Sequence, residues 1–325
     1  MHGLTQAQVD QFNEQGYLVV EDLIDVVQDL DPLLDEYSAR LDQLAEEMHA
    51  AGKLSSTYAD LPFGRRLTKV YAETGQVFAQ YFDFSLPFSG VTPETPCHFG
   101  PAVFRMLSNP AILDVVEALI GPEIYSNPVQ HVRLKPPEKY VPRDPTTGRV
   151  LLGATPWHQD AGVVREEADE TNMLTVWIPL VDATVENGCL AVVPRNHHSG
   201  LLQHCASPTL GTHLPETVFD IDGSVPQPIK RGGALFMHKQ TPHSSLSNES
   251  EDVRISMDLR YNPIGQPTGR DDFPGFVARS RQHPESELHD PETWRRLWLE
   301  TRDRLTENAP VVPFHRWKAG APGCA

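Results

Sequence analysis

The sequence contains few cysteines, few positive charges and no long apolar run, and each shortage excludes a class of protein. Its four cysteines, Cys97, Cys189, Cys205 and Cys324, include no Cys-x-x-Cys pair, so we predict reduced thiols and not a disulfide framework. The formal net charge of −17, from 27 Lys and Arg against 44 Asp and Glu residues, argues against nucleic acid or an anionic membrane as a partner. No stretch approaches the length of a membrane-spanning helix, and the N-terminal residues lack the basic and apolar regions of a secretory signal. We therefore expect a cytoplasmic protein.

Proline is the residue in excess, and it indicates a chain of short elements. The 29 prolines are about 9% of all residues, against a usual ~5%. Because proline interrupts helices and central strands, a bundle of long helices is not expected. Helical signals are confined mainly to residues 1–121. One helix begins with a capping box at Thr5 and Gln8 and ends at Gly16, and another begins at Asp31.

A strand pattern replaces the helical one after residue 121. Short runs rich in β-branched and aromatic residues are separated by turn residues, which is typical of a sandwich or barrel. The clearest runs are 129–134, 173–181, 189–193, 234–237 and 253–261. We predict a single domain over residues 1–325, mainly β with flanking helices. Its predicted parts are a mostly helical flank at 1–121, a β core at 122–261 and a C-terminal extension at 262–325.

Two segments carry candidate metal ligands. In an extended backbone, His158 and Asp160 point to the same side because they are two residues apart. A second histidine about 85 residues later completes two imidazoles and one carboxylate, the facial triad that suits non-haem Fe(II) oxygenases. Two residues, His243 and His238, are candidates for this position. The carboxylate does not by itself exclude zinc.

A candidate anion-binding residue follows His243 by eleven residues. The segment 253–260 alternates apolar and polar residues, which predicts a strand with Arg254 and Ser256 on one face. A guanidinium group binds a carboxylate through two parallel hydrogen bonds. An iron oxygenase that uses a dicarboxylate as electron donor needs such a cation near the metal. Pairing with a neighbouring aspartate would instead make Arg254 a structural residue.

Taken together, these residues resemble the phytanoyl-CoA dioxygenase family of Fe(II)- and 2-oxoglutarate-dependent oxygenases. The resemblance extends from about Phe12 to about Tyr261 and rests on motifs that occur in the family's order. The motifs are Trp157-His158-Gln159-Asp160-Ala161, Val176-Trp177-Ile178-Pro179-Leu180, Glu186-Asn187-Gly188-Cys189-Leu190, and Gly233 to Phe236 before His243. The spacing from His243 to Arg254 also matches the family, which places no ligand at His238.

The resemblance implies a fold, a set of cofactors and a set of site residues. The fold is a double-stranded β-helix, the cupin-like jelly-roll. The implied cofactors are Fe(II), 2-oxoglutarate and O2. The metal ligands would be His158, Asp160 and His243, and Arg254 would hold the distal carboxylate of 2-oxoglutarate. Three further residues would line the cosubstrate, namely Trp177, Ser245 and His131. No catalytic residue beyond the metal ligands is implied.

The implied activity is hydroxylation or another oxidation of a C–H bond in a small-molecule metabolite, with conversion of 2-oxoglutarate to succinate and CO2. The same site could carry out desaturation, cyclisation or epimerisation. Halogenases related to the family have a small residue at the carboxylate ligand, so Asp160 disfavours halogenation. The alternative from another class is a non-catalytic jelly-roll that binds a small ligand or zinc. The sequence identifies neither the substrate, nor the oligomeric state, nor a role for residues 262–325.

Overall fold

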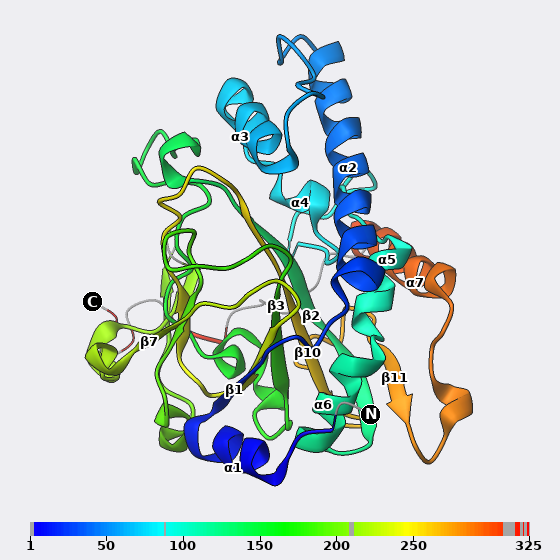
Figure 1. Ribbon diagram of the computed structural model, residues 1–325, viewed down its shortest axis with the longest axis vertical. Helices are drawn as coiled ribbons and strands as arrows, with labels where there is room; N and C mark the ends of the chain where they lie inside the picture. Colours follow the sequence, from blue (N-terminus) through cyan, green and yellow to red (C-terminus); the bar gives the residue numbers. More distant parts are fainter. Residues whose placement is uncertain are drawn as a thin grey trace.

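Helices occupy the first third of the chain and its C-terminal part, and strands occupy the middle (Figure 1). The computed structural model describes residues 3–324 except 88, 208–210, 308–315, 319–320 and 322–323. The α-helices of this part are α1 (Gln6–Gln15), α2 (Asp31–Ala50), α3 (Phe63–Thr74), α4 (Ala79–Phe82), α5 (Pro101–Leu107), α6 (Pro110–Ile120) and α7 (Pro291–Glu307). A turn of π-helix at Val26–Leu30 precedes α2, and several 3-10 helices, among them Asp160–Val163, connect the strands.

The strands form antiparallel sheets. The largest sheet has six strands in the order β1-β8-β3-β10-β2-β11, the second has three in the order β7-β4-β9, and β5 and β6 form a hairpin. The strands are β1 (Tyr17–Val20), β2 (Glu123–Lys135), β3 (Leu174–Pro179), β4 (Leu190–Val192), β5 (Cys205–Ser207), β6 (Gly211–His213), β7 (Val225–Gln227), β8 (Ala234–His238), β9 (His243–Ser245), β10 (Arg254–Pro263) and β11 (Phe276–Ser280). Residues of the six-stranded and three-stranded sheets line one shared cavity. The predicted β architecture with flanking helices is therefore present.

The N-terminal helix leads directly into the largest sheet. The Thr5 amide donates to Gln8 Oε1 at 2.9 Å, and the Gln8 amide donates to Thr5 Oγ1 at 3.4 Å, which confirms the predicted capping box. Gly16 ends the helix with a φ of +79°, a left-handed conformation that glycine adopts without steric cost. The chain then continues as β1, which pairs with β8. Residues of the predicted helical flank thus supply an edge strand of the sheet.

Strand β10 separates the apolar core from the cavity. Its odd-numbered residues from Ile255 to Leu259 are buried in the core that the helices share. On its other face Arg254, Asp258 and Arg260 line the cavity. The predicted alternation is therefore present, but both faces are covered. The polar face looks into the space between the sheets and not toward bulk solvent.

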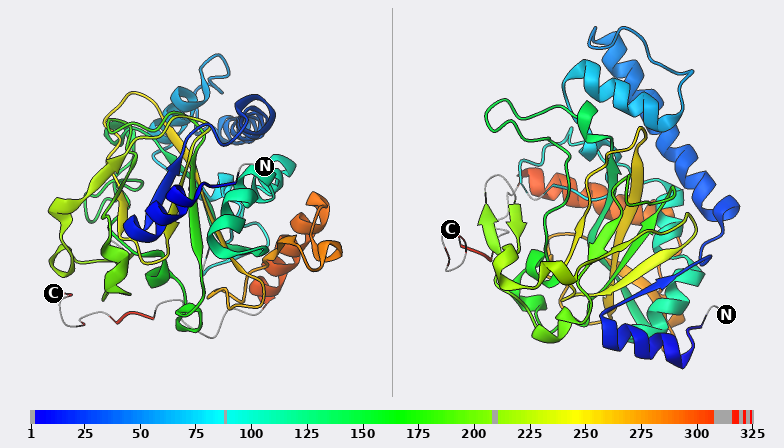
Figure 2. Two further views of the ribbon diagram at one scale, coloured as in Figure 1. Left: turned by 60° about the horizontal axis from the view of Figure 1, so that its bottom comes forward. Right: turned by 60° about the vertical axis from the view of Figure 1, so that its left-hand side comes forward.

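The chain beyond residue 261 completes both the sheet and the helical layer. Strand β11 pairs with β2 at the edge of the six-stranded sheet. Helix α7 buries Trp294 and Trp298, whose rings lie 5.6 and 5.5 Å from that of Phe99. Figure 2 shows α7 on the side of the molecule that carries α5 and α6. Apolar burial thus fixes much of the segment for which the sequence suggested no role.

One disulfide bond corrects the prediction of four reduced thiols. Cys205 in β5 is bonded to Cys324, with 119 residues of sequence separation, whereas Cys97 and Cys189 are free. Spacing along the chain does not reveal this pair, because only the path of the folded tail brings Cys324 beside β5. No helix in the described part of the chain is both long enough and apolar enough to cross a membrane.

Candidate metal and cosubstrate site

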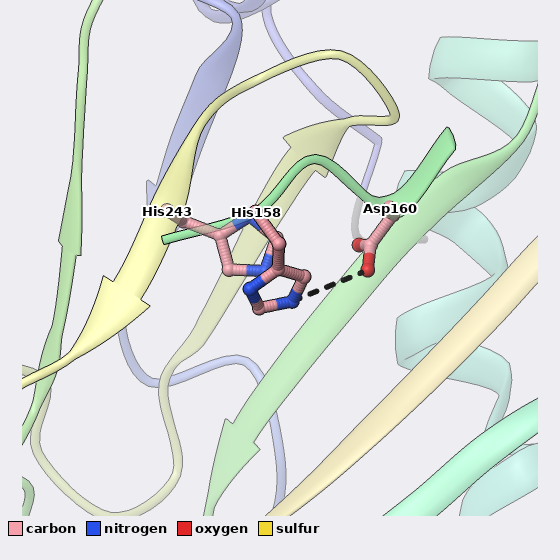
Figure 3. Close-up of side chains that lie close together, drawn as sticks. All are labelled: His158, Asp160 and His243. Carbon is pink, nitrogen blue, oxygen red and sulfur yellow. Dashed lines mark ion pairs between the residues drawn. The ribbon is translucent and has the colours of Figure 1, made fainter. Parts of the chain in front are cut away.

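A backbone pairing brings the two histidine ligands together. The His158 amide donates to the His243 carbonyl at 3.0 Å, and the His243 amide donates to the His158 carbonyl at 2.9 Å. The two imidazole rings therefore lie side by side, with centroids 4.2 Å apart. His158 Nε2 lies 3.9 Å from Asp160 Oδ1, and one ligand atom from each of the three residues lies within 4.8 Å of the others (Figure 3). His238, the alternative candidate, does not belong to this cluster.

Both imidazoles are held in the form that binds a metal. Nδ1 of His158 lies 2.8 Å from the Pro156 carbonyl, and Nδ1 of His243 lies 3.0 Å from the Thr241 carbonyl. Because a carbonyl only accepts, each Nδ1 carries the proton and each Nε2 keeps its lone pair. Burial, followed by the neighbouring His243, lowers the pKa of His158 to about 3. His158 is thus a neutral ligand at physiological pH.

The carboxylate ligand is fixed by two residues that sequence reasoning missed. The Arg260 guanidinium bonds one oxygen of Asp160, and the Thr175 hydroxyl donates to the other. Burial alone would raise the pKa of Asp160, but Arg260 and the two imidazoles hold it well below its usual range. The alternation in β10 already placed Arg260 on the same face as Arg254, but its partner lies 100 residues away in the chain.

This donor set fits iron. Two imidazoles and one ionised carboxylate converge on one point, which is the arrangement that Fe(II) oxygenases use while leaving further positions open. The ligands come from the 158–160 segment and from β9. The carboxylate is oriented by Arg260, which lies in β10, and by Thr175, which lies in the neighbouring strand β3. Oriented outer partners of this kind raise metal affinity.

Arg254 has the surroundings of a carboxylate-binding residue. The residue is 2% exposed, and its guanidinium lies 5.5 Å from the centre of the Trp177 ring. Nη1 donates to the Ser256 hydroxyl at 2.5 Å, while Nε has no hydrogen-bond partner in the part of the chain that the structure describes. Burial lowers its pKa to about 10, so the group stays charged at neutral pH. A buried cation with an unsatisfied donor suits an incoming carboxylate.

A cavity of about 300 Å³ joins the metal cluster to the predicted cosubstrate residues. Its lining includes His158, His243 and the four predicted cosubstrate residues, which are Arg254, Trp177, Ser245 and His131. The Ser245 hydroxyl accepts from the Lys135 side-chain amine and from the Thr155 amide. His131 Nδ1 lies 2.8 Å from Asp83 Oδ2, so one of its ring nitrogens already has a partner.

Lys135 is a further polar residue of this region. It lies on β2 opposite Arg254 of β10. Burial, together with the charge of Arg254, lowers the pKa of Lys135 to about 6. An incoming carboxylate would favour the protonated amine, because an opposite charge nearby raises the pKa of an amine.

Comparisons with known proteins identify the family of this sequence. The family model described as Phytanoyl-CoA dioxygenase (PhyH) matches residues 12–256. Phytanoyl-CoA dioxygenase domain-containing protein 1 of Danio rerio is 25% identical over 275 residues, covering 78% of this chain and 88% of the relative. The protein of the same name from Bos taurus is 27% identical over 278 residues, covering 77% and 87%.

Solved structures confirm the jelly-roll fold. The non-heme monooxygenase ThoJ aligns over 93% of this chain and 99% of its own, with a TM-score of 0.56 and 17% identity. The non-heme alpha ketoglutarate dependent carbocyclase SnoK from nogalamycin biosynthesis aligns over 88% and 94%, with a TM-score of 0.51 and 16% identity. Because the family model spans most of the chain and the facial triad is intact, the protein belongs to the phytanoyl-CoA dioxygenase (PhyH) family of Fe(II)- and 2-oxoglutarate-dependent oxygenases.

Proposed function

We propose that the protein hydroxylates a C–H bond of a small-molecule metabolite, with one oxygen atom of O2 entering the alcohol and the other entering succinate as 2-oxoglutarate loses CO2. The observation that carries the proposal is the buried Arg254 guanidinium in the same cavity as the His-Asp-His cluster. A jelly-roll that only bound zinc would have no use for this cation beside its metal. An oxygenase needs both, because the cosubstrate is a dicarboxylate.

Each residue of the site has a defined task in this reaction. His158, Asp160 and His243 would hold the iron, which when bound supplies the O2-derived oxidant with electrons from 2-oxoglutarate. Arg254 would bind the distal carboxylate, and the face of Trp177 would confine the cosubstrate. Apolar side chains also line the cavity, among them Val129, Leu190 and Met237.

The remaining assignments concern Ser245 and His131, which line the same cavity. We propose that the Ser245 hydroxyl, which accepts from Lys135, donates its own proton to the distal carboxylate. The ring of His131, which is bonded to Asp83, would contact the cosubstrate. Both contacts would orient the cosubstrate and would leave the chemistry to the metal.

Succinate formation tests the proposal. Protein incubated with Fe(II), 2-oxoglutarate and air, with and without a mixture of candidate metabolites, should form succinate in a metal-dependent way. His243→Ala should abolish it, whereas the matched variant His238→Ala should retain it. Arg254→Ala should raise the 2-oxoglutarate concentration required by about tenfold to a hundredfold, the effect of losing a charge-assisted hydrogen bond. Equal succinate formation by His243→Ala and the parent protein would contradict the assignment.

The partners and the location are part of the same proposal. We infer a small-molecule substrate and no nucleic-acid or membrane partner, because acidic residues outnumber basic ones over the whole chain. We also propose that the chain acts as one domain in the cytoplasm. Disulfide bonds are uncommon in cytoplasmic proteins, so the Cys205–Cys324 bond makes this location testable. Thiols are alkylated at the moment of cell lysis and identified by mass spectrometry. Alkylated Cys205 and Cys324 would agree with a cytoplasmic location, whereas an intact disulfide would argue against it.

A further inference from the structure

The hairpin of β5 and β6 forms one side of the cavity that contains the metal cluster. Gly211 and Thr212 of β6 line this cavity together with the two imidazole ligands. The Leu214 amide, directly after β6, donates to the Trp157 carbonyl at 2.7 Å, and Trp157 is the residue before the first metal ligand. A displacement of the hairpin would therefore change the shape of the cavity close to the metal.

A covalent bond joins this hairpin to the C-terminal tail. Cys205 of β5, which pairs with His213 of β6, is bonded to Cys324. Cys205 is 3% exposed, whereas Cys324 is partly exposed. A thiol in solution therefore reaches the bond at the Cys324 sulfur. Exposed disulfides are the ones that cellular thiols reduce most readily, whereas buried structural ones resist reduction.

The tail also contacts a second segment of the cavity wall. The Trp317 indole donates to the Gly162 carbonyl at 2.6 Å, and the Arg316 guanidinium binds both carboxylate oxygens of Asp169. Gly162 precedes Val163, which lines the cavity. The tail thus connects β6 with the 3-10 helix Asp160–Val163, and these two elements are called the wall segments below.

The disulfide supplies a large part of the restraint on the tail. The Asp169 side chain is 37% exposed, and an exposed ion pair contributes little to stability because water screens it. A crosslink between residues 119 positions apart restricts the chain much more strongly. When the bond is open, the tail is therefore held against the wall segments by weak contacts only.

We propose that Cys205 and Cys324 form a reversible redox modification site that controls the mobility of the wall segments. On reduction, two glutathione thiols become glutathione disulfide, and each cysteine sulfur takes up one electron and one proton. Glutathione disulfide reverses the step. Cytoplasmic disulfides are usually transient and redox-sensing, so a reducing cytoplasm would favour the mobile form and an oxidising one the fixed form. The proposal goes beyond the proposed function, and its tests need no turnover.

A redox titration tests the modification site. The full chain is equilibrated in mixtures of reduced and oxidised glutathione, its thiols are alkylated in denaturant, and mass spectrometry gives the fraction of Cys205 bonded to Cys324. We expect this fraction to rise from mostly reduced to mostly oxidised across the series, because Cys324 is accessible to glutathione. A pair that stays reduced in oxidised glutathione, or oxidised in reduced glutathione, overturns the proposal.

Hydrogen exchange tests the effect on the wall segments. Exchange of backbone amides is compared between the oxidised and the reduced parent protein by mass spectrometry. Amides of the wall segments should exchange about tenfold or more faster after reduction, because the loss of a crosslink lowers the free energy of local opening. Amides of β8, which lies inside the six-stranded sheet, should exchange at the same rate in both forms.

Two variants assign the effect to the bond. Cys324→Ser should show the fast exchange of the wall segments with and without reductant. Cys97→Ser, which removes a free thiol and leaves the disulfide in place, should keep the difference between the two forms. Equal exchange of the wall segments in the oxidised and the reduced parent protein overturns the proposal, and this comparison does not depend on the folding of any variant.

Discussion

The metal end of the cavity and the part of its wall formed by Arg133 and Arg270 are built in different ways. At the metal end, His158 and His243 are each oriented by a carbonyl two residues earlier in the chain. In that part of the wall, Arg133 pairs with a residue 125 positions away, and Arg270 comes from a loop. Local sequence therefore determines the geometry of the ligands, whereas packing between distant segments determines where these two arginines lie. A short motif can identify the first but not the second.

Contacts between distant segments also stabilise the metal end, on the side away from the cavity. The backbone amide of Gln159, between two ligands, donates to His204 Nε2 at 3.0 Å. Trp317 of the tail lies over the His204 ring at 5.1 Å and donates to the Gly162 carbonyl at 2.6 Å. The Cys205–Cys324 bond fixes the tail next to this point. Three predictions test how far the metal end depends on such contacts.

Removal of Arg260 should have the largest effect. In Arg260→Met, Asp160 would keep its buried charge without its guanidinium partner and with only the Thr175 hydroxyl bonded to it, so the metal-free protein should lose about 3–5 kcal/mol in the free energy of unfolding. Urea unfolding measures this loss. Added Fe(II) should restore part of it, since the metal takes over the compensating charge.

The control for this prediction is Arg165→Met, which breaks the more exposed pair with Asp272. It should cost about 1 kcal/mol or less. If Arg260→Met lowers the free energy of unfolding by no more than this control does, the stability of the metal end does not depend on Arg260. Local sequence would then account for the metal end alone.

Opening the disulfide should have the next largest effect. Cys324→Ser removes a crosslink that closes a loop of 119 residues, so the free energy of unfolding should fall by about 2–4 kcal/mol. Thermal unfolding with and without a dithiol reductant measures it: the reductant should lower the Tm of the parent protein and leave that of the variant unchanged. Cys97→Ser, which removes a free thiol, should keep the sensitivity to reductant. A parent Tm that ignores complete reduction would contradict the prediction.

Acid should weaken the support behind the metal end by a smaller, graded amount. Burial lowers the pKa of His204 to about 4, against about 6.5 in an unfolded chain. Between these values the unfolded state binds the extra proton, so the stability that His204 contributes is complete above pH 6.5 and is lost as the pH falls toward 4. The slope approaches about 1.4 kcal/mol per pH unit.

The measurement compares urea unfolding of the parent protein and His204→Gln between pH 7 and 4.5. The variant should show the smaller dependence on pH, because glutamine does not titrate. If the free energy of unfolding depends on pH with the same slope in both proteins, His204 does not contribute to the acid sensitivity.

Much of the fold and the metal site could be predicted from the sequence. The capping box at Thr5, the left-handed stop at Gly16 and the two faces of β10 each follow from neighbouring residues, and the structure contains all three. The role of the C-terminal region could not be predicted. Strand β11 and the tryptophans of α7 acquire their positions from partners more than 100 residues earlier, such as Phe99.

The sequence by itself determined the His158, Asp160 and His243 cluster and the cosubstrate candidate Arg254. Each depends on spacing within one segment, or on two segments whose motifs are recognisable separately. Tertiary structure alone decided that Arg260 holds Asp160, that Cys205 meets Cys324 and that Arg270 reaches the cavity. The physical reason is that the electrostatic field and the hydrogen-bond partners of a buried charge come from every segment that packs against it. A sequence gives the order of those segments along the chain but not their contacts in space.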